Sequence, residues 1–356
     1  MTLQAWIDDI EHRDWQHTTA GTVRIALVGV GWWTTDVALP AIDASDLCES
    51  TVLVSGDVER ARGIADAHDV AHVISYDAFH DGEVAAAYDA VYIATPNAHH
   101  LEYAETAAEH GAAVLCEKPL EATADRARRL VTACEDVPLM TAYRMQTDPL
   151  LRRTKELIAA DIIGDPRSVA GMNQQPLLAM NDDPGQWRLD SDKTGYGTSV
   201  MDLGIYVLNT ARFLLDRDPV EVFARMTSID EAFADVPDQW ASFSIALEGG
   251  IPLVGTTSQD AQTSSSLVIS GDSGQIALDP AYSGELLLTI TRGDTTLRIS
   301  HDAIDVEREM TEEFDYFADR VLSGRDIVPD GEHGLLDLKT IAAIHHAAET
   351  GKPVSL

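Results

Sequence analysis

Between residues 23 and 142 the chain repeatedly alternates a short apolar run with a longer stretch of helical periodicity. Continuous apolar runs are typical of strands buried on both faces, and the helices between such strands cover those faces. Strands joined in this way run parallel in one sheet. The expected strands are Val23–Val28, Val52–Ser55, Ala90–Thr95, Ala112–Cys116 and Pro138–Ala142, and the expected helices span 36–44, 58–68, 99–110 and 123–134. The alternation therefore predicts an α/β domain with a doubly wound parallel sheet.

From residue 165 the pattern changes to short β-rich runs separated by turns such as Glu248-Gly-Gly250. Repeated short strands with such turns are typical of an antiparallel sheet. The expected strands span 168–172, 220–227, 241–247, 251–258, 266–270, 275–278, 286–291 and 295–300, with helices over 200–215, 306–322 and 335–349. Because few helices remain to cover both faces, we predict a large, mostly antiparallel open-faced sheet in an α+β domain.

These patterns divide the chain into an N-terminal extension over 1–21, a first domain over 22–145 and a second domain over 146–356. The extension carries Trp6 and Trp15 and is expected to form a short amphipathic helix that packs on the body. The two C-terminal helices are expected to pack near the first domain.

Charge restricts the partners of this chain. The sequence has 59 acidic and 25 basic residues, a net charge of -34 spread along its length, and 45% hydrophobic residues. An acidic surface repels phosphate backbones and anionic lipids, so nucleic acid and membranes are poor partners. Apolar content this high indicates a globular protein. We therefore expect a salt-adapted cytoplasmic protein, since molar salt shortens the Debye length to about 3 Å and screens self-repulsion.

Cysteine usage and apolar runs agree with a cytoplasmic location. Cys48, Cys116 and Cys134 have no metal-like spacing and are expected to be core thiols in a reducing compartment, with no metal site. No run of about 18 apolar residues is present, which argues against a membrane span. The acidic N-terminus shows no secretory signal.

A glycine turn follows the first expected strand. Gly29 and Gly31 match the first two glycines of the dinucleotide fingerprint, which allow a tight turn and close approach of the pyrophosphate. Thr34 occupies the third position. Trp32 and Trp33 stand where the loop would cover a cofactor, and either one could equally be a core anchor. The placement favours a nucleotide-binding domain of Rossmann type.

The end of the second strand bears on the type of cofactor. An acidic residue there would bind the adenosine ribose and repel a 2′-phosphate. Here Ser55 and Gly56 end the strand, and Arg60 stands one helical turn further on, where it can hold a phosphate. These residues favour NADP over NAD. Alternatively, Asp57 turns back to the ribose and Arg60 is a solvated helix charge.

Two further turns lie at strand ends, where ligands bind in such sheets. Thr95, Pro96 and Asn97 could line the nicotinamide ribose, and His99 and His100 then open a helix. After the fifth strand the chain presents Lys118, the only lysine among the first 154 residues. Pro119 removes a backbone donor and stiffens the turn, so the amine has a fixed direction.

The spacing of these motifs resembles the family of glucose-fructose oxidoreductase, inositol dehydrogenase and related sugar dehydrogenases. The motifs are Gly29-Val-Gly31, Thr95-Pro96-Asn97, Glu117-Lys118-Pro119 and Tyr143-Arg144. The Glu-Lys-Pro element is the most specific of them. The run from Gly195 to Tyr206 looks like the family's second motif, a glycine turn that opens a helix carrying Asp202. Thr34 and Tyr196 depart from the family pattern.

Physical reasoning supports the second motif. Asp202 and Tyr206 are four residues apart, so on a helix they share a face. A phenol with a pKa near 10 is a poor base at neutral pH, but an adjacent ammonium such as Lys118 would lower that pKa. The alternative is a buried tyrosine beside a helix charge.

The resemblance also implies specific site residues. It implies cofactor contacts from Gly29, Gly31, Trp32, Trp33, Ser55, Gly56, Arg60, Thr95, Pro96, Asn97, His100, Glu117 and Lys118. It implies catalysis by Lys118, Asp202 and Tyr206, and substrate contacts from Arg144, Trp187, Arg188, Asp202 and Tyr206. Gln174 and Gln175 are further candidates for contact with sugar hydroxyls.

Tyr206, Ser55-Gly56 and Trp187-Arg188 are most similar to the family's NADP-dependent aldose dehydrogenases. This similarity implies oxidation of an aldopyranose at C1 to its lactone, with D-xylose as the implied substrate, and a homo-oligomer formed through the open sheet face. Three alternatives remain open at this point: an enzyme that retains NADP and transfers hydride between two sugars, an inositol dehydrogenase, and a regulator that senses NADP without chemistry.

Overall fold

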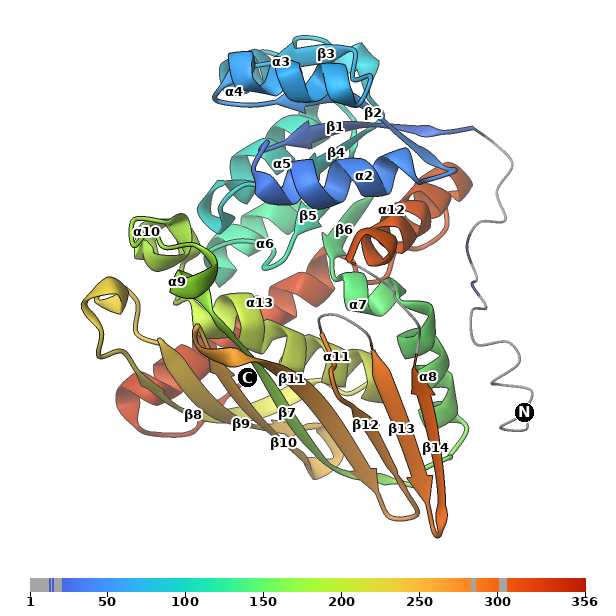
Figure 1. Cartoon of the computed structure of the whole chain (residues 1–356), viewed down its shortest axis with the longest axis vertical. Coiled ribbons are helices and arrows are strands. Elements are labelled where there is room, and N and C mark those ends of the chain that lie inside the picture. The colour runs from blue at the N-terminus through green and yellow to red at the C-terminus, as the bar shows by residue number, and fades with distance from the viewer. Residues whose placement is uncertain (1–12, 14, 16–20, 283–285, 301–305) are drawn as a thin grey trace. The chain divides into compact units, whose positions relative to one another are not determined.

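The structure is a computed structural model that describes residues 13, 15, 21–282, 286–300 and 306–356. The chain forms two compact units (Figure 1). The first unit includes residues 13–147 and 306–336, and the second includes 148–305 and 337–356. Helix α13 (Gly331–Thr350) contributes residues to both units.

The first unit contains a six-stranded sheet in the order β3-β2-β1-β4-β5-β6. All of its strand pairs are parallel. The strands are β1 (Val23–Val28), β2 (Cys48–Val54), β3 (His72–Ile74), β4 (Ala90–Ile93), β5 (Ala113–Glu117) and β6 (Leu139–Ala142). The predicted doubly wound parallel sheet is therefore confirmed, and its strand order reverses between β1 and β4, where such sheets bind nucleotides.

Two strands differ from the prediction. Strand β2 begins at Cys48, four residues before the predicted start, because Glu49, Ser50 and Thr51 are partly or fully exposed and break the continuous apolar run. Strand β3 was not predicted. It has three residues, of which only Ile74 is buried, so it carries no apolar run to recognise.

Helices join these strands. They include α3 (Val58–Ala67), α5 (His100–Glu109) and α6 (Ala124–Ala133). The helix predicted over 36–44 consists of a π-helical turn, η1 (Thr34–Ala38), that continues into α2 (Leu39–Asp43). The short helix α7 (Arg144–Thr147) follows the last strand.

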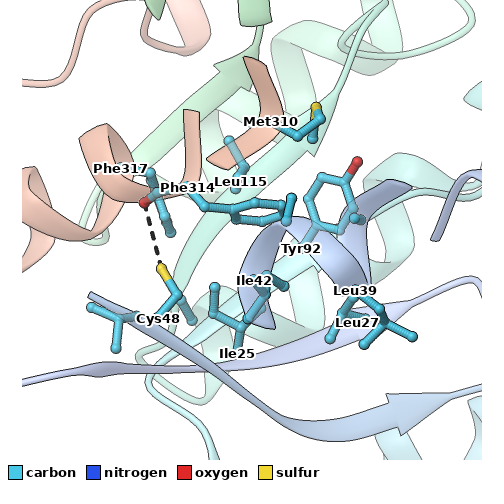
Figure 2. Packing of buried hydrophobic residues seen from close by; sticks show 14 of the residues in the cluster. Ile25, Leu27, Leu39, Ile42, Cys48, Tyr92, Leu115, Met310, Phe314 and Phe317 are labelled. Atoms are coloured by element: carbon cyan, nitrogen blue, oxygen red, sulfur yellow. Dashed lines mark hydrogen bonds between the residues drawn. The ribbon is translucent and has the colours of Figure 1, made fainter. Parts of the chain in front are cut away.

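Helix α12 (Val306–Ser323), near the end of the chain, packs on the first sheet (Figure 2). The ring of Phe314 meets the ring of Tyr92 on β4 edge to face, with centroids 5.1 Å apart. Ile25 and Leu27 of β1, Leu115 of β5, Leu39 and Ile42 of α2, and Met310 and Phe317 of α12 belong to the same buried cluster. The core of the nucleotide-fold unit is thus built from both ends of the chain.

Helix α12 is acidic, yet several of its carboxylates are buried. Glu312 forms an ion pair with Arg13, Asp319 forms one with Arg325, and Asp315 accepts a hydrogen bond from Ser45. Buried charges are tolerated when they are paired in this way. The amphipathic helix predicted over 1–21 lies outside the described residues, except for Arg13, Trp15 and Gly21.

The second unit contains a nine-stranded sheet in the order β14-β13-β12-β11-β7-β10-β9-β8-β15. Its strands are β7 (Pro166–Pro176), β8 (Pro219–Thr227), β9 (Trp240–Leu247), β10 (Ile251–Ser258), β11 (Asp260–Gly271), β12 (Gln275–Leu278), β13 (Leu287–Arg292), β14 (Thr295–Ser300) and β15 (Val354–Ser355). Among the described strand pairs of this sheet, β7 with β10 is the one parallel pair. The mostly antiparallel sheet is therefore confirmed.

Helix α11 (Ile205–Leu215) packs on one face of this sheet. A Cβ atom at Gly171 of β7 would lie 2.5 Å from Cγ1 of Val207, so glycine is needed where helix and strand approach. Helix α8 (Pro149–Ala159) also packs against α11. No helix in the described part of the chain is both long and apolar enough to cross a membrane.

Candidate active site

The glycine turn after β1 is fixed by close backbone contact. Gly29 has a φ of +94°, and a Cβ atom there would lie 2.7 Å from the carbonyl oxygen of Ala94, so no other residue fits without a shift. A Cβ atom at Gly31 would meet nothing within 4 Å. Thr34, at the third position of the motif, is buried, and its Oγ1 donates a hydrogen bond to the Gly29 carbonyl at 2.5 Å. Thr34 therefore closes the turn through a side-chain bond.

The two tryptophans of this turn differ in their surroundings. Nε1 of Trp33 donates to the hydroxyl of Tyr92 at 2.9 Å and to Oε1 of Glu117 at 3.2 Å. Trp32 is 56% exposed, and its ring lies edge to face against Trp33. Trp33 is thus anchored in the first unit, and Trp32 is the one whose ring is open to contact.

The residues that follow β2 hold Arg60 beside the glycine turn. The Asp57 carboxylate accepts a hydrogen bond from the Arg60 backbone N–H at 3.0 Å and caps helix α3. Ser55 is buried, and its hydroxyl accepts from the Asp57 N–H at 3.1 Å. Nη1 of Arg60 donates to the Val30 carbonyl at 2.9 Å, which holds this exposed arginine beside the glycine turn. Asp57 thus serves as the N-cap of α3, and Gly56, between Ser55 and Asp57, is exposed.

The turn after β4 is joined to the segment that follows β5. His100 is fully buried, with Nε2 3.0 Å from the carbonyl oxygen of Thr95 and Nδ1 3.2 Å from that of Leu120. His100 therefore bridges the ends of two neighbouring strands. Asn97 is buried at the start of a short 3-10 helix whose N-cap is Pro96.

Glu117 lies at the centre of a hydrogen-bond network at the end of β5. Its Oε1 accepts from the hydroxyl of Tyr92 at 2.6 Å as well as from Trp33, and its Oε2 accepts from the Lys118 backbone N–H at 3.1 Å. Lys118 follows, partly buried, and its peptide bond to Pro119 is cis. Burial and the charge of Glu117 raise the pKa of Tyr92 well above its usual range, so the phenol donates to the carboxylate.

Helix α12 adds two carboxyl groups to this region of the first unit. Arg144 forms an ion pair with Glu309, which is buried. The pKa of Glu313 lies well above its usual range, because the side chain is fully buried and Glu117 is nearby. The guanidinium of Arg144 is therefore engaged within the first unit.

Asp202 and Tyr206 lie on one continuous helix, as predicted, but its first turn is not α-helical. Residues Val200–Gly204 form a π-helical turn, η5, which leads into α11. Both side chains are partly buried, and the ring of Tyr206 lies 5.7 Å from that of Tyr282. Sequence periodicity could not distinguish the π turn from an α-helix. The packing that accompanies this turn is tertiary, since Gly204 lies close to the ring of Phe243, which is distant in the sequence.

A polar network surrounds Asp202 in the second unit. Oδ2 of Asp202 accepts from Nε of Arg188 and from Nε2 of Gln259, both at 3.0 Å. Oε1 of Gln259 accepts in turn from Nε2 of Gln175 at 2.8 Å. The Arg188 guanidinium also lies over the ring of Trp187, 4.5 Å from its centre. The structure therefore brings Arg188, Trp187 and Gln175 to Asp202.

Gln174, the neighbour of Gln175, does not join this network. Its Nε2 donates to the Gln262 carbonyl at 3.2 Å. Successive strand residues point to opposite faces of a sheet, so adjacent glutamines on β7 cannot serve the same site.

Two residues of this region were not identified from the sequence. Gln259 is fully buried between β10 and β11, and Asp238 is fully buried just before β9. Each lies far along the chain from Asp202 and belongs to no motif, so only the folded chain reveals its role.

A parallel sheet in this strand order, with a glycine turn after β1, defines a dinucleotide-binding protein of Rossmann type. Residues 23–143 match the GFO/IDH/MocA oxidoreductase family with its NAD-binding Rossmann fold, and residues 151–277 match a GFO/IDH/MocA C-terminal domain. The chain belongs to the GFO/IDH/MocA family of oxidoreductases.

Individual relatives are similar over most or all of the chain. D-xylose 1-dehydrogenase [NADP(+)] of Haloarcula marismortui is 48% identical, with 100% of each chain covered. D-xylose 1-dehydrogenase (NADP(+)) 2 of Haloferax volcanii is 29% identical over 89% of this chain and 95% of the relative. Among solved structures, aldose-aldose oxidoreductase from Caulobacter crescentus, complexed with glycerol, is 28% identical and has a TM-score of 0.87, with 94% and 100% coverage.

Replacing Gln259 by Leu should lower the free energy of unfolding by about 1 to 3 kcal/mol, because the change removes a hydrogen bond to the charged Asp202 and leaves the Gln175 amide without its acceptor. Denaturant titration in molar salt measures this loss. Gln262→Leu, at an exposed position of β11, is the matched control and should change stability by less than about 0.5 kcal/mol. Equal losses of stability in the Gln259 and Gln262 variants would contradict the role of Gln259 in the Asp202 network.

Proposed function

We propose that this protein is an NADP-dependent aldose 1-dehydrogenase that oxidises D-xylose to D-xylonolactone. The observation that carries the proposal is 48% identity, over the whole length of both chains, to the D-xylose 1-dehydrogenase [NADP(+)] of Haloarcula marismortui. The chain provides the residue types that the reaction needs: a lysine at a strand end, and a tyrosine and an aspartate on one helix.

Several features of the first unit fit NADP. Gly29 keeps the turn tight, Gly31 leaves open space for close approach, and Oγ1 of Thr95 is buried without a hydrogen-bond partner among the described residues. A buried hydroxyl of this kind is suited to a bound ligand. Gly29, Gly31, Trp32, Thr95, Pro96, Asn97, Glu117 and Lys118 would hold the cofactor, with Trp33 and His100 fixing the turns around it.

Selectivity for NADP rests on Arg60 and Asp57. Arg60 is held beside the glycine turn by its bond to Val30, and its remaining N–H groups can donate to a 2′-phosphate. The Asp57 carboxylate caps α3 through its Oδ1. Ser55 and Gly56 complete the phosphate side of the site.

The chain's own residues perform the proton chemistry. Bound NADP⁺ would supply the hydride acceptor for oxidation at C1 of the sugar. Tyr206 takes the proton of the C1 hydroxyl, so that C1 loses a hydride and its oxygen a proton, and the lactone carbonyl forms. In this proposal Lys118 supplies the positive charge that favours the phenolate form of Tyr206.

Asp202 orients the sugar hydroxyls. Arg188 and Gln259 hold its Oδ2, which fixes the direction of the carboxylate. Trp187 and Arg188 supply an apolar ring and a donor to the same region.

We also propose that the protein is a homo-oligomer through the open face of the nine-stranded sheet. The pairing of strands places the following residues on that face of the four central strands: Ala170, Met172, Ser242, Ser244, Val254, Thr256, Ser266 and Val268. None of these is acidic, although the whole chain has 59 acidic residues. A second copy can therefore cover these central positions without bringing carboxylates together there.

The net charge of -34 fits a cytoplasm with molar salt, where surface repulsion is screened. The three cysteines are free and buried, as expected in a reducing compartment. We propose a salt-rich cytoplasm as the protein's location.

The wild-type protein should reduce NADP⁺ with D-xylose in molar salt, followed as absorbance at 340 nm, and more efficiently than with hexoses or inositols. Lys118→Ala and Tyr206→Phe should each lower kcat by about 100-fold or more, because each removes part of the proton path. The controls Lys352→Ala and Tyr88→Phe should retain activity. Near-normal turnover in the Lys118 and Tyr206 variants would refute their roles, and absence of NADP⁺ reduction with every aldose would refute the function.

Arg60→Ala should raise KM for NADP⁺ about tenfold or more and leave KM for NAD⁺ nearly unchanged, because only NADP carries the 2′-phosphate. Arg62→Ala on the same helix is the control, since Arg62 is exposed and pairs with Glu59. Initial rates over a range of each nucleotide measure the effect. Equal KM increases for both nucleotides would show that Arg60 does not read the phosphate.

Val254→Glu should shift the protein to monomers in molar salt, because it places a charge at the centre of the open face, where Val254 is 51% exposed. Light scattering coupled to size exclusion measures the mass. Ile229→Glu, at a site 71% exposed and outside these central strands, should leave the oligomer intact. A monomeric wild-type protein would rule the interface out.

A further inference from the structure

The helix that carries Asp202 and Tyr206 begins without a capping side chain of its own. Its N-cap residue, Ser199, makes no side-chain cap. Instead, Oδ1 of Asp238 accepts a hydrogen bond from the Thr198 N–H at 2.6 Å, and Oδ2 accepts from the Val200 N–H at 2.8 Å. One distant carboxylate therefore satisfies two of the backbone donors at the start of this helix.

Neighbouring loops also hold the same turn. Oγ of Ser199 donates to the Gln239 carbonyl at 3.0 Å and accepts from the Gln259 N–H at 3.0 Å. Oγ1 of Thr257 donates to the Ser199 carbonyl at 3.1 Å. These three bonds all involve Ser199, three residues before Asp202.

Gly197 is needed for this arrangement. A Cβ atom there would lie 2.4 Å from Oδ1 of Asp238 and 2.6 Å from Cε1 of His345. No larger residue fits between the carboxylate and the helix start. The glycine turn that the sequence presents before Asp202 thus allows the carboxylate to reach the backbone.

From this geometry we infer that Asp238 is a positioning residue for the reaction, which holds the first turn of the catalytic helix and thereby sets the places of Asp202 and Tyr206. This inference rests on the proposed function. Asp238 does not touch the substrate in this account. It acts through the backbone of residues 198–202, and its negative charge also matches the positive end of the helix dipole.

The surroundings of Asp238 make its charge state sensitive to pH. The titratable group that faces Asp238 is His345 of α13, with Nε2 4.0 Å from Oδ2, and the ring of Tyr196 lies 5.9 Å from that of His345. Burial raises the pKa of Asp238 to about 7, although the N–H donors oppose the shift, and burial lowers the pKa of His345 to about 3. Near neutral pH the histidine is therefore uncharged, and only Asp238 titrates.

The sign of the pH effect follows from the two oxygens of the carboxyl group. Above pH 7 both accept, and the helix start is held. Below pH 7 a proton binds one carboxyl oxygen, and the hydrogen bond that this oxygen accepts from the backbone is weakened. Protection of the Thr198 and Val200 amides from hydrogen exchange, relative to their intrinsic rates, should therefore be greater at pH 8 than at pH 6.

Asp238→Asn is the test variant, because it keeps the volume and removes the charge and one acceptor. We expect kcat with the aldose to fall by roughly 100-fold, since a small displacement of reacting groups has an effect of this size. The Kd for NADPH, measured by fluorescence, should stay within about twofold, because no predicted cofactor residue lies on this helix. Amide protection at 198 and 200 should fall and lose its difference between pH 6 and pH 8.

Asp148→Asn is the matched control. Asp148 is also a fully buried capping aspartate and accepts from the Leu151 N–H at the start of α8, a helix that carries none of the predicted site residues. This variant should lose stability without a comparable loss of kcat. An equal loss of kcat in the two variants, or unchanged kcat and protection in Asp238→Asn, would overturn the inference.

The amide-exchange readout does not depend on catalysis. If the wild-type protein oxidises no aldose, the proposed function fails, and the exchange data still decide whether Asp238 holds the helix start. If the wild-type protein is active and Asp238→Asn is equally active, the function stands and the positioning role fails.

Discussion

The contact between Gly29 and the backbone of Ala94 is the constraint on which the nucleotide end of the first sheet depends. These residues directly follow β1 and β4, the two strands between which the order of the sheet reverses. A side chain at Gly29 would separate the strand ends, and the turn would no longer present open space at Gly31. Thr34 fastens the same turn from the other side through its bond to the Gly29 carbonyl. A threonine can thus replace the third glycine of the motif. Its hydroxyl donates a hydrogen bond to the turn, which a glycine could not do.

In the second unit, side chains fix the conformation of the functional segment. Its helix start carries the candidate catalytic residues, and it is held by groups from the loops before β9 and after β10. Holding a functional segment with rigid elements far away in the sequence is a common way to fix geometry. The dense hydrogen bonding around Ser199, Asp238 and Gln259 explains why a π turn persists there, since tertiary bonds satisfy donors that a regular first turn would leave to solvent.

Acidic residues are used differently inside and outside the protein. On α12 the buried carboxylates pair with arginines such as Arg13, Arg144 and Arg325. Arg13 meets both oxygens of Glu312, a two-pronged geometry that lysine cannot supply. The central strands of the open sheet face instead carry small, hydroxyl and apolar residues. Charged side chains are thus absent from these central positions of the open face.

The sequence by itself determined the two sheets, the order of most elements and the residues of the recurring motifs, because apolar periodicity and turn residues act over a few neighbouring positions. It also placed Asp202 and Tyr206 on one helix and Lys118 at a strand end. It did not reveal β3, whose three residues carry no apolar run, or the π turn at Val200–Gly204. Only the tertiary structure decided that Trp33 is an anchor, that Gln175 and not Gln174 meets the Asp202 network, and that Asp238 and Gln259 hold the helix start. The physical reason is that these roles depend on hydrogen bonds between residues tens of positions apart, whose partners are chosen by the packing of the whole unit.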